Sequence, residues 1–129
     1  MSVSVSIIVP CYNVAAYLDQ CMESLTGQSM EDIEIICVND GSSDHTAEIL
    51  RGWRNRDGRV RIIDQKNSGV SVARNSGMEA AVGEYIGFVD PDDMVERNMF
   101  QRLFTAAAEK DADVAVCGYH EFCDCGDVD

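Results

Sequence analysis

The sequence predicts an α/β fold in which a mostly parallel sheet carries helices on both faces. Two observations support this prediction. Short runs rich in β-branched residues alternate along the chain with segments whose apolar residues recur at helical spacing. Each apolar run also ends in a group of polar or turn-forming residues. Strands connected through helices lie parallel with right-handed crossovers, and 129 residues are typical of one domain.

The predicted strands are short, buried and rich in valine and isoleucine. The first is expected to stop at Pro10, and the second at the turn-forming run Asn39–Ser43. In chain order the expected strands are Val3–Val9, Ile33–Val38, Val60–Asp64, Tyr85–Val89 and Val114–Cys117.

Four helices are predicted from apolar residues that fall on one side of a helix. The first presents Val14, Leu18, Cys21, Met22 and Leu25, and Gly27 ends it. The second follows Ser and Asp residues that can cap it, and presents Ala47, Ile49, Leu50 and Trp53. The third, over residues 69–82, has a face of small residues suited to close packing on a sheet, namely Ala73, Gly77, Ala80 and Ala81. The fourth presents Phe100, Leu103, Phe104, Ala107 and Ala108.

The charge balance excludes several classes of partner. The chain has 23 acidic and 10 basic residues, a net charge of −13. Duplex nucleic acid is therefore not an expected partner, because its phosphates require a basic surface. No apolar run reaches the roughly 18 residues of a membrane-spanning helix, and the N-terminus lacks the features of a signal peptide. A cytoplasmic location is predicted, with the inner face of the membrane as a further option for a full-length protein.

The six cysteines do not predict a disulfide scaffold. Those within apolar segments are expected to be free core thiols, and they are Cys11, Cys21, Cys37 and Cys117. Cys123 and Cys125 lie near His120, but a second pair of metal ligands is absent. Residues 119–129 are therefore interpreted as an exposed acidic tail.

Polar and acidic residues follow each predicted strand, where ligands of open α/β sheets bind. These strand ends are Pro10–Asn13, Asn39–Ser42, Gln65–Asn67 and Asp90–Asp93. Neither a Gly-x-Gly-x-x-Gly fingerprint nor a P-loop is present, so a phosphate would have to be bound in another way. Two carboxylates at i and i+2, on Asp90 and Asp92, can hold Mg²⁺ or Mn²⁺, which bridges phosphate oxygens.

Each of these residues also has a purely structural interpretation, and the residues alone leave both open. Asp92 and Asp93 would favour the N-terminal dipole of the helix that follows. Asp40 suits ordinary turn and capping chemistry. Tyr12 can cover the edge of a core or stack on a base. Arg74 can extend to solvent or reach a phosphate or carbonyl of a ligand.

Taken together, four segments resemble the family 2 inverting glycosyltransferases, which have the Rossmann-like GT-A fold. The segments are Val5–Asn13, Val38–Asp44, Asn67–Gly77 and Gly83–Asp93. Each motif is weak by itself, but the four occur in the family's order and at its spacing from about residue 3 to residue 118.

The resemblance implies a nucleotide-sugar donor, most often a UDP-sugar, bound with a divalent metal, Mn²⁺ or Mg²⁺. Tyr12 would stack on uracil, Asp40 would accept a hydrogen bond from the base, and Arg74 would approach the base or the phosphates. The implied donor-binding residues are Pro10, Tyr12, Asn13, Asp40, Arg74 and Asp90. The implied metal ligands are Asp92 and Asp90, with Asp93 beside them. Asp44 is assigned to loop structure and capping.

In the family, an acceptor hydroxyl attacks the anomeric carbon with inversion after a carboxylate base deprotonates it. The resemblance places that base in a later half of the protein, beyond Asp129, because no earlier acid matches it. Residues 1–129 are therefore expected to be the N-terminal, donor-binding part of a longer enzyme, truncated here and weakly active or inactive alone. The expected acceptor is a carbohydrate or a lipid-linked sugar, and self-association through an exposed apolar edge is expected.

Two functions of other classes compete with this hypothesis. A receiver-type signalling domain has a similar length and alternation of elements, but of its acidic residues only Asp64 has a counterpart here, after the third predicted strand. A non-catalytic nucleotide-binding module would use the same residues for binding without transfer.

Overall fold

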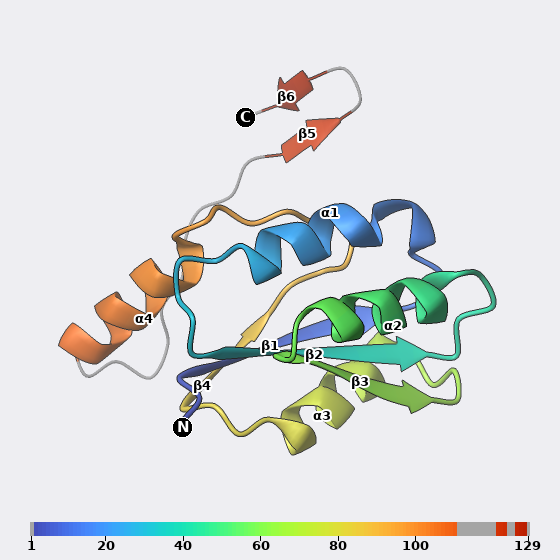
Figure 1. Cartoon of the computed structure of the whole chain (residues 1–129), viewed down its shortest axis with the longest axis horizontal. Coiled ribbons are helices and arrows are strands. Elements are labelled where there is room, and N and C mark those ends of the chain that lie inside the picture. Colours follow the sequence, from blue (N-terminus) through green and yellow to red (C-terminus); the bar gives the residue numbers. More distant parts are fainter. Residues whose placement is uncertain (1, 111–120, 124–125, 129) are drawn as a thin grey trace.

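A parallel sheet of four strands forms the centre of the protein in a computed structural model that describes residues 2–110, 121–123 and 126–128 (Figure 1). The strand order is β3-β2-β1-β4, and every neighbouring pair is parallel. The strands are β1 (Val5–Cys11), β2 (Ile33–Asp40), β3 (Val60–Gln65) and β4 (Tyr85–Phe88). The predicted α/β fold class is confirmed. The expected strand Val114–Cys117 lies outside the described residues.

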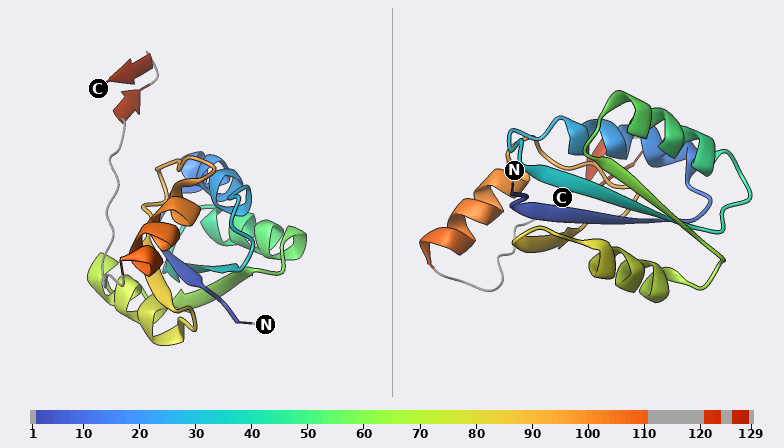
Figure 2. Two further views of the ribbon diagram at one scale, coloured as in Figure 1. Left: turned by 90° about the vertical axis from the view of Figure 1, so that its left-hand side faces the viewer. Right: turned by 60° about the horizontal axis from the view of Figure 1, so that its bottom comes forward.

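Helices cover both faces of the sheet, as predicted. Figures 1 and 2 show α1 and α2 on one face, α3 on the opposite face, and α4 beside the β4 edge. The helices are α1 (Ala15–Thr26), α2 (Thr46–Arg56), α3 (Val70–Ala80) and α4 (Met99–Glu109). Within the expected acidic tail, β5 (Glu121–Cys123) and β6 (Gly126–Val128) form a separate antiparallel pair.

Alternating residues of the strands build two cores. The core under α1 and α2 contains Ile7 and Ile35 with Leu18 and Leu50. The core under α3 contains Ile8, Ile36, Val38 and Ala73. Because both faces are covered, β1 and β2 are buried along their whole length and read in the sequence as continuous rather than alternating apolar runs. The predicted core thiols Cys11, Cys21 and Cys37 are buried and free, whereas Cys117 lies outside the described residues.

The first strand does not stop at Pro10, as the sequence suggested, but continues to Cys11. Val89 N donates to Ile8 O at 3.1 Å, so the polar backbone groups of Ile8 face β4. Pro10 lies two residues further and faces the same side, where β4 has already ended at Phe88. The missing N–H of proline therefore removes no hydrogen bond from the sheet.

The second strand also extends further than predicted, through Asn39 and Asp40. These residues pair in register with Asp64 and Gln65 of β3. Asn39 Nδ2 donates to Asp64 Oδ1 at 3.0 Å, and Gln65 Nε2 donates to Asp40 Oδ1 at 2.9 Å. Buried polar side chains are tolerated in a strand when hydrogen bonds satisfy them. The predicted turn at Asn-Asp-Gly-Ser rested on local preferences alone, and these do not include the partners on β3.

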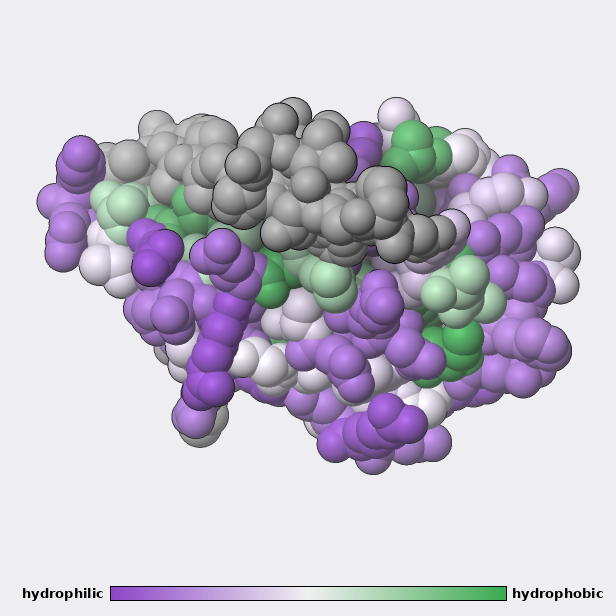
Figure 3. Space-filling view, turned by 90° about the horizontal axis from the view of Figure 1, so that it is seen from above, coloured by the Kyte–Doolittle hydropathy of each residue, from purple (hydrophilic) through white to green (hydrophobic). Residues whose placement is uncertain are grey.

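The surface is mostly polar on the face that Figure 3 shows, where hydrophobic areas of the described residues are small and separated. Within the described residues, no helix combines the length and the apolar character that crossing a membrane requires.

A buried polar network lies at the amino ends of the strands. Glu34 of β2 is only 5% exposed and accepts hydrogen bonds from Ser6 Oγ at 2.5 Å and Val82 N at 2.8 Å. Arg61 Nη1 donates to Glu34 Oε1 at 2.7 Å, and Gly83 N donates to Ser6 Oγ at 2.8 Å. The network thereby ties the connection between α3 and β4 to three strands. Local sequence patterns do not predict this network.

Close packing of α3 on the sheet leads to a stability prediction. A Cβ at Gly77 would lie 2.5 Å from Ile8 Cγ2, a stiff β-branched side chain in the core. Gly77→Ala is expected to lower the free energy of unfolding by about 1 kcal/mol, because overpacking of about 1–3 kcal/mol exceeds the gain in helix propensity of about 1 kcal/mol. Urea denaturation measures the difference.

Gly52 in α2 supplies the matched control for this prediction. A Cβ there meets no atom within 4 Å, so Gly52→Ala gains helix propensity without a clash. It is expected to raise the free energy of unfolding by about 0.5–1 kcal/mol. Equal effects of the two substitutions would show that α3 can move away from Ile8.

Candidate donor and metal site

A pocket of about 290 Å³ opens at the carboxyl ends of β1 and β2. Three of the residues implied by the family resemblance line it, namely Pro10, Tyr12 and Asp40. The other lining residues are Cys11, Asn67, Gly69, Val70 and Ala73. Asn67 belongs to a predicted strand end. Gly69, Val70 and Ala73 lie in a predicted helix and in the resemblance segment Asn67–Gly77, but none of the three is among the predicted binding residues.

Tyr12 lines the pocket at the end of β1, and Asn13 follows it in the chain. The Tyr12 side chain is 51% exposed beside the pocket, so its ring has a face open to solvent. Asn13 adopts a left-handed backbone with φ of 51°, which asparagine tolerates. Its N–H donates to Ser42 Oγ at 3.0 Å, and its Oδ1 accepts from Ser43 N at 2.8 Å. Asn13 therefore joins the loops that follow β1 and β2.

Asp40 lies at the base of the pocket and is only 4% exposed. Its Oδ1 accepts from Gln65 Nε2 and from Ser68 N at 2.8 Å, and its Oδ2 accepts from Gly69 N at 3.0 Å. Burial alone raises the pKa of this carboxyl, but the three hydrogen bonds outweigh burial and lower the pKa below its ordinary value. Asp40 is therefore ionised at neutral pH and fixes the chain that leads into α3.

Gly41 permits the close approach of this chain to the end of β2. Its φ of 70° lies in the left-handed region, and a Cβ there would lie 2.6 Å from the backbone nitrogen of Asn67. Only glycine fits both requirements. The loop after β2 and the loop before α3 consequently form one continuous pocket wall.

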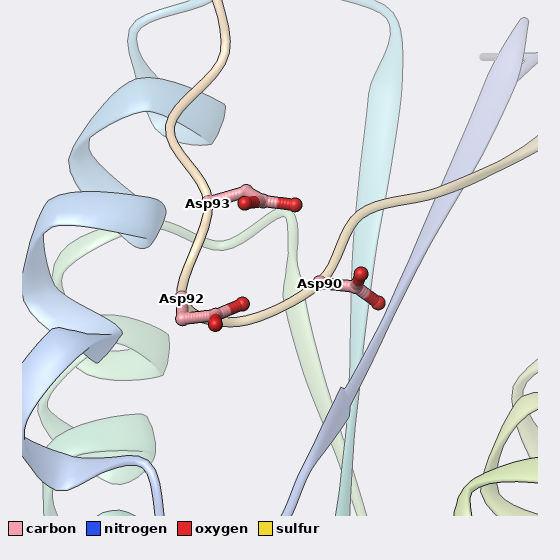
Figure 4. Close-up of side chains that lie close together, drawn as sticks. All are labelled: Asp90, Asp92 and Asp93. Carbon is pink, nitrogen blue, oxygen red and sulfur yellow. The ribbon is translucent and has the colours of Figure 1, made fainter. Parts of the chain in front are cut away.

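Three carboxylates gather on the turn that follows β4. Asp90, Asp92 and Asp93 are exposed, and each offers an oxygen within 4.8 Å of the others (Figure 4). Asp93 N donates to Asp90 O at 3.0 Å, which closes the turn. Burial and the negative charges of Asp92 and Asp90 raise the pKa of Asp93 above its ordinary value. Neighbouring carboxylates at this spacing repel one another in the absence of a cation.

The alternative interpretation of these acids as a helix N-terminus is wrong. The helix that follows begins only at Met99, and its first turn contains no acidic residue. Asp92, Asp93 and Glu96 precede it on irregular chain. Their negative charges are consequently not placed to stabilise the α4 dipole, which acts within the first turn.

Arg74 pairs with the acidic turn from a position next to the pocket. Its Nη2 lies 3.5 Å from Asp90 Oδ1, while the preceding residue, Ala73, lines the pocket. Both partners are partly exposed, with 41% and 57% of their side-chain surfaces accessible, so the pair contributes little to stability. Arg74 neither extends alone into solvent nor contacts the pocket base. The structure thus brings Asp40, Arg74 and Asp90 to the same edge of the sheet.

The acidic turn fits a hard divalent cation by its donor chemistry. Carboxylate oxygens are the ligands that Mg²⁺ and Mn²⁺ prefer, and the close negative charges that raise the pKa of Asp93 would be neutralised by such an ion. Beneath the turn, Cys21 Sγ donates to Asp90 O at 3.7 Å. Burial, then the neighbouring Cys11 thiol and the negative charges of Asp93, Asp92 and Asp90, raise the pKa of the Cys21 thiol to about 12, so it remains a neutral donor.

Asp44 has the structural role that the sequence analysis assigned to it. Its Oδ1 accepts from Thr46 N at 2.9 Å at the start of α2. Its Oδ2 accepts from Ala15 N at 3.2 Å at the start of α1. One carboxylate therefore caps two helices and holds them side by side above the sheet.

Comparison with known proteins identifies relatives of the whole described fold. The family model "Glycosyl transferase family 2" matches residues 6–128. The uncharacterized glycosyltransferase EpsJ of Bacillus subtilis is 50% identical over 117 residues, which cover 91% of this chain and 34% of EpsJ. Glycosyltransferase GlyG of Streptococcus pneumoniae is 43% identical over 123 residues, which cover 95% of this chain and 41% of GlyG. The chain thus spans well under half of the length of these two relatives.

A solved structure shows the same arrangement. S. aureus TarS in complex with UDP matches with a TM-score of 0.74 and 32% identity over 84% of this chain and 32% of the TarS chain. A second TarS structure, in complex with UDP-GlcNAc, matches equally well, with a TM-score of 0.74. These matches and the family model exclude the alternative prediction of a receiver-type signalling domain. The chain belongs to glycosyl transferase family 2 and has its Rossmann-like GT-A fold.

Proposed function

We propose that this chain is the donor-binding part of an inverting glycosyltransferase that uses a UDP-sugar. One observation carries the proposal, which is that the pocket at the ends of β1 and β2 and the acidic turn after β4 lie at one edge of the sheet, where Arg74, next to the pocket residue Ala73, pairs with Asp90 of the turn. A nucleotide-sugar has a base and a diphosphate, and needs two such adjoining subsites. The structural match to TarS in complex with UDP supports the choice of nucleotide.

The pocket supplies recognition of the base. Pro10 and Tyr12 form its apolar walls, and the exposed ring of Tyr12 stacks on uracil. Asp40 Oδ2 receives one backbone N–H and retains capacity for a further donor, the imide N–H of uracil. The lowered pKa of Asp40 keeps it an acceptor at neutral pH. Asn13 joins the chain after Tyr12 to the loop after β2.

The acidic turn and Arg74 supply recognition of the diphosphate. Asp92 and Asp90 would hold Mn²⁺ or Mg²⁺, with Asp93 beside them, and a cation held there would supply the positive charge that a leaving nucleoside diphosphate needs. Arg74 turns its guanidinium from Asp90 toward the phosphates when the donor is present. The acceptor, a carbohydrate or lipid-linked sugar, and a cytoplasmic location remain predictions.

Calorimetric titration with UDP, GDP and ADP, with and without Mn²⁺, tests the proposal. UDP is expected to bind most tightly, with an affinity that rises when Mn²⁺ is present. Tyr12→Ala is expected to weaken UDP binding about 10-fold, because stacking of a base on an aromatic ring contributes about 1–3 kcal/mol. Tyr17→Ala is the control, because Tyr17 is an exposed tyrosine on α1 that does not line the pocket. Equal, metal-independent affinity for all three nucleotides would contradict the proposal.

A further inference from the structure

The turn that carries the three aspartates lies on a segment with little regular structure of its own. Residues 89–98 connect β4 to α4 and contain neither helix nor strand. Local backbone bonds are few, such as Asp93 N to Asp90 O and Met99 N to Glu96 O, both at 3.0 Å. Because the three carboxylates repel one another, contacts from elsewhere must hold them in place.

These contacts come from one side of α1 and the residues that follow it. Cys21 Sγ donates to Asp90 O, and Ser24 Oγ accepts from Val95 N at 3.2 Å. Gln28 Nε2 donates to Glu96 O at 2.7 Å. Cys21 and Ser24 lie three positions apart on one side of α1, and Gln28 follows the end of the helix at Thr26. We call Cys21, Ser24 and Gln28 the polar seam.

The side chain of Gln28 makes more hydrogen bonds than those of Cys21 and Ser24. It is only 6% exposed, and its Nε2 also donates to Ser24 O at 3.1 Å. Its Oε1 accepts from Phe100 N at 3.2 Å, which satisfies one of the free N–H groups at the start of α4. One amide therefore joins the end of α1, the loop and the beginning of α4.

Phe100 of α4, whose N–H binds Gln28, also contacts β4, the strand that precedes the aspartate turn. Phe100 is buried, and its Cε1 lies 2.6 Å from the position that a Cβ on Gly87 of β4 would occupy. The Phe100 ring thus packs directly on the backbone of β4. Gln28 consequently fixes the segment at its far end, while β4 fixes it at the near end, with the aspartates between them.

We propose that Gln28, with Ser24, is a positioning residue that preorganises the aspartate turn for its divalent cation. This inference rests on the proposed function. The seam touches backbone atoms of the loop rather than the carboxylates, so it acts through the position of Asp90, Asp92 and Asp93. A turn that is already held in its binding geometry loses little conformational entropy when the cation binds. The affinity for the cation is therefore higher than it would be for a flexible turn.

Mn²⁺ titration followed by the electron paramagnetic resonance of the free ion tests the inference in the absence of nucleotide. Gln28→Met keeps the approximate size of the side chain but removes all three hydrogen bonds. It is expected to weaken Mn²⁺ binding about 10-fold or more, as loss of groups that orient metal ligands does. Ser24→Ala removes one bond to the loop, from Val95 N, and one bond within α1, to Cys21 O. It is the milder variant, with an expected weakening of about 3-fold.

Two controls separate positioning from general destabilisation. Glu34→Gln perturbs the network at the opposite end of the strands, so it is expected to lower the melting temperature without changing Mn²⁺ affinity. UDP affinity without metal is expected to stay within about 2-fold in Gln28→Met, since no member of the seam lines the pocket.

The outcomes distinguish this inference from the proposed function. Normal Mn²⁺ affinity in both Gln28→Met and Ser24→Ala would overturn the positioning role and leave the metal site intact. Equal loss of Mn²⁺ affinity in Glu34→Gln would also overturn it, because destabilisation alone would then explain the effect. Absence of Mn²⁺ binding to the unchanged protein would overturn the metal site itself, and the inference with it.

Discussion

Asp92→Ala is expected to abolish the Mn²⁺-dependent part of UDP binding. The affinity measured in the presence of Mn²⁺ should fall by about 100-fold, which corresponds to roughly 2.8 kcal/mol. The physical reason is that an acidic surface repels a diphosphate unless a cation lies between them. Removing one of three closely spaced carboxylates removes both a proposed ligand and part of the negative potential that would attract the cation.

Asp92 is expected to matter more than its two neighbours because of their surroundings. Asp90 already has Arg74 within 3.5 Å. Burial and the negative charges of Asp92 and Asp90 raise the pKa of Asp93, which disfavours the charged form of its carboxyl group. No cationic group of the described residues pairs with Asp92, so its full charge is available to an ion.

Isothermal titration calorimetry of UDP with and without Mn²⁺ measures this effect. Glu79→Ala is the matched control, because it also removes one negative charge from an exposed position, on α3 but outside the acidic turn. The control should retain the Mn²⁺ dependence of the unchanged protein. If Asp92→Ala binds UDP as tightly as the control does in Mn²⁺, the acidic turn is not the cation site.

The site could be anticipated from the sequence because of a general property of parallel sheets. The carboxyl ends of β1, β2 and β4 meet at one edge, so polar residues far apart in sequence become neighbours there. That rule places Tyr12, Asp40 and Asp90 together without any knowledge of side-chain positions. It does not predict the pair between Arg74 and Asp90, because the direction of a long side chain depends on its final surroundings.

The extents of the strands were less predictable than their existence. Pro10 and Asn39 are turn-forming residues by local preference, but both lie inside strands. Pro10 is tolerated because β4 is short, and Asn39 is tolerated because Asp64 of β3 accepts its hydrogen bond. Both reasons depend on a neighbouring strand, so local sequence patterns do not contain them.

The polar residues that hold the site and the sheet together were missed for the same reason. Gln28 reads as an ordinary polar residue after a helix, although its partners Glu96 and Phe100 lie 68 and 72 positions later. Glu34 interrupts an apolar strand, and its partner Val82 lies 48 positions later. A polar residue inside a predicted buried strand is the one available signal, because burial of a carboxylate requires partners.

Glu34→Ala is expected to cause the largest loss of stability, about 3 kcal/mol of the free energy of unfolding. The substitution leaves the fully buried Ser6 hydroxyl without its acceptor. It also removes the acceptor of the Val82 N–H, but Val82 is 68% exposed, so most of the loss is assigned to Ser6. The ion pair contributes less, because the Arg61 side chain is 45% exposed and remains hydrated without its partner. Urea denaturation at pH 7 measures the change, and Glu79→Ala should stay within about 0.5 kcal/mol of the unchanged protein.

The pH dependence of stability tests the same network through its charge. Burial alone raises the pKa of the Glu34 carboxyl, but hydrogen bonds from Ser6, Val82 and Arg61 outweigh burial, so its pKa in the folded protein lies below the ordinary 4.5. A group whose pKa is lowered by folding stabilises the protein above its unfolded-state pKa, and this contribution is lost as the pH falls through the folded-state pKa. The stability difference between the unchanged protein and Glu34→Gln should therefore be constant above about pH 5.5 and shrink below pH 4.5. A difference that stayed constant down to pH 3 would show that the hydrogen bonds at Glu34 do not depend on its ionisation.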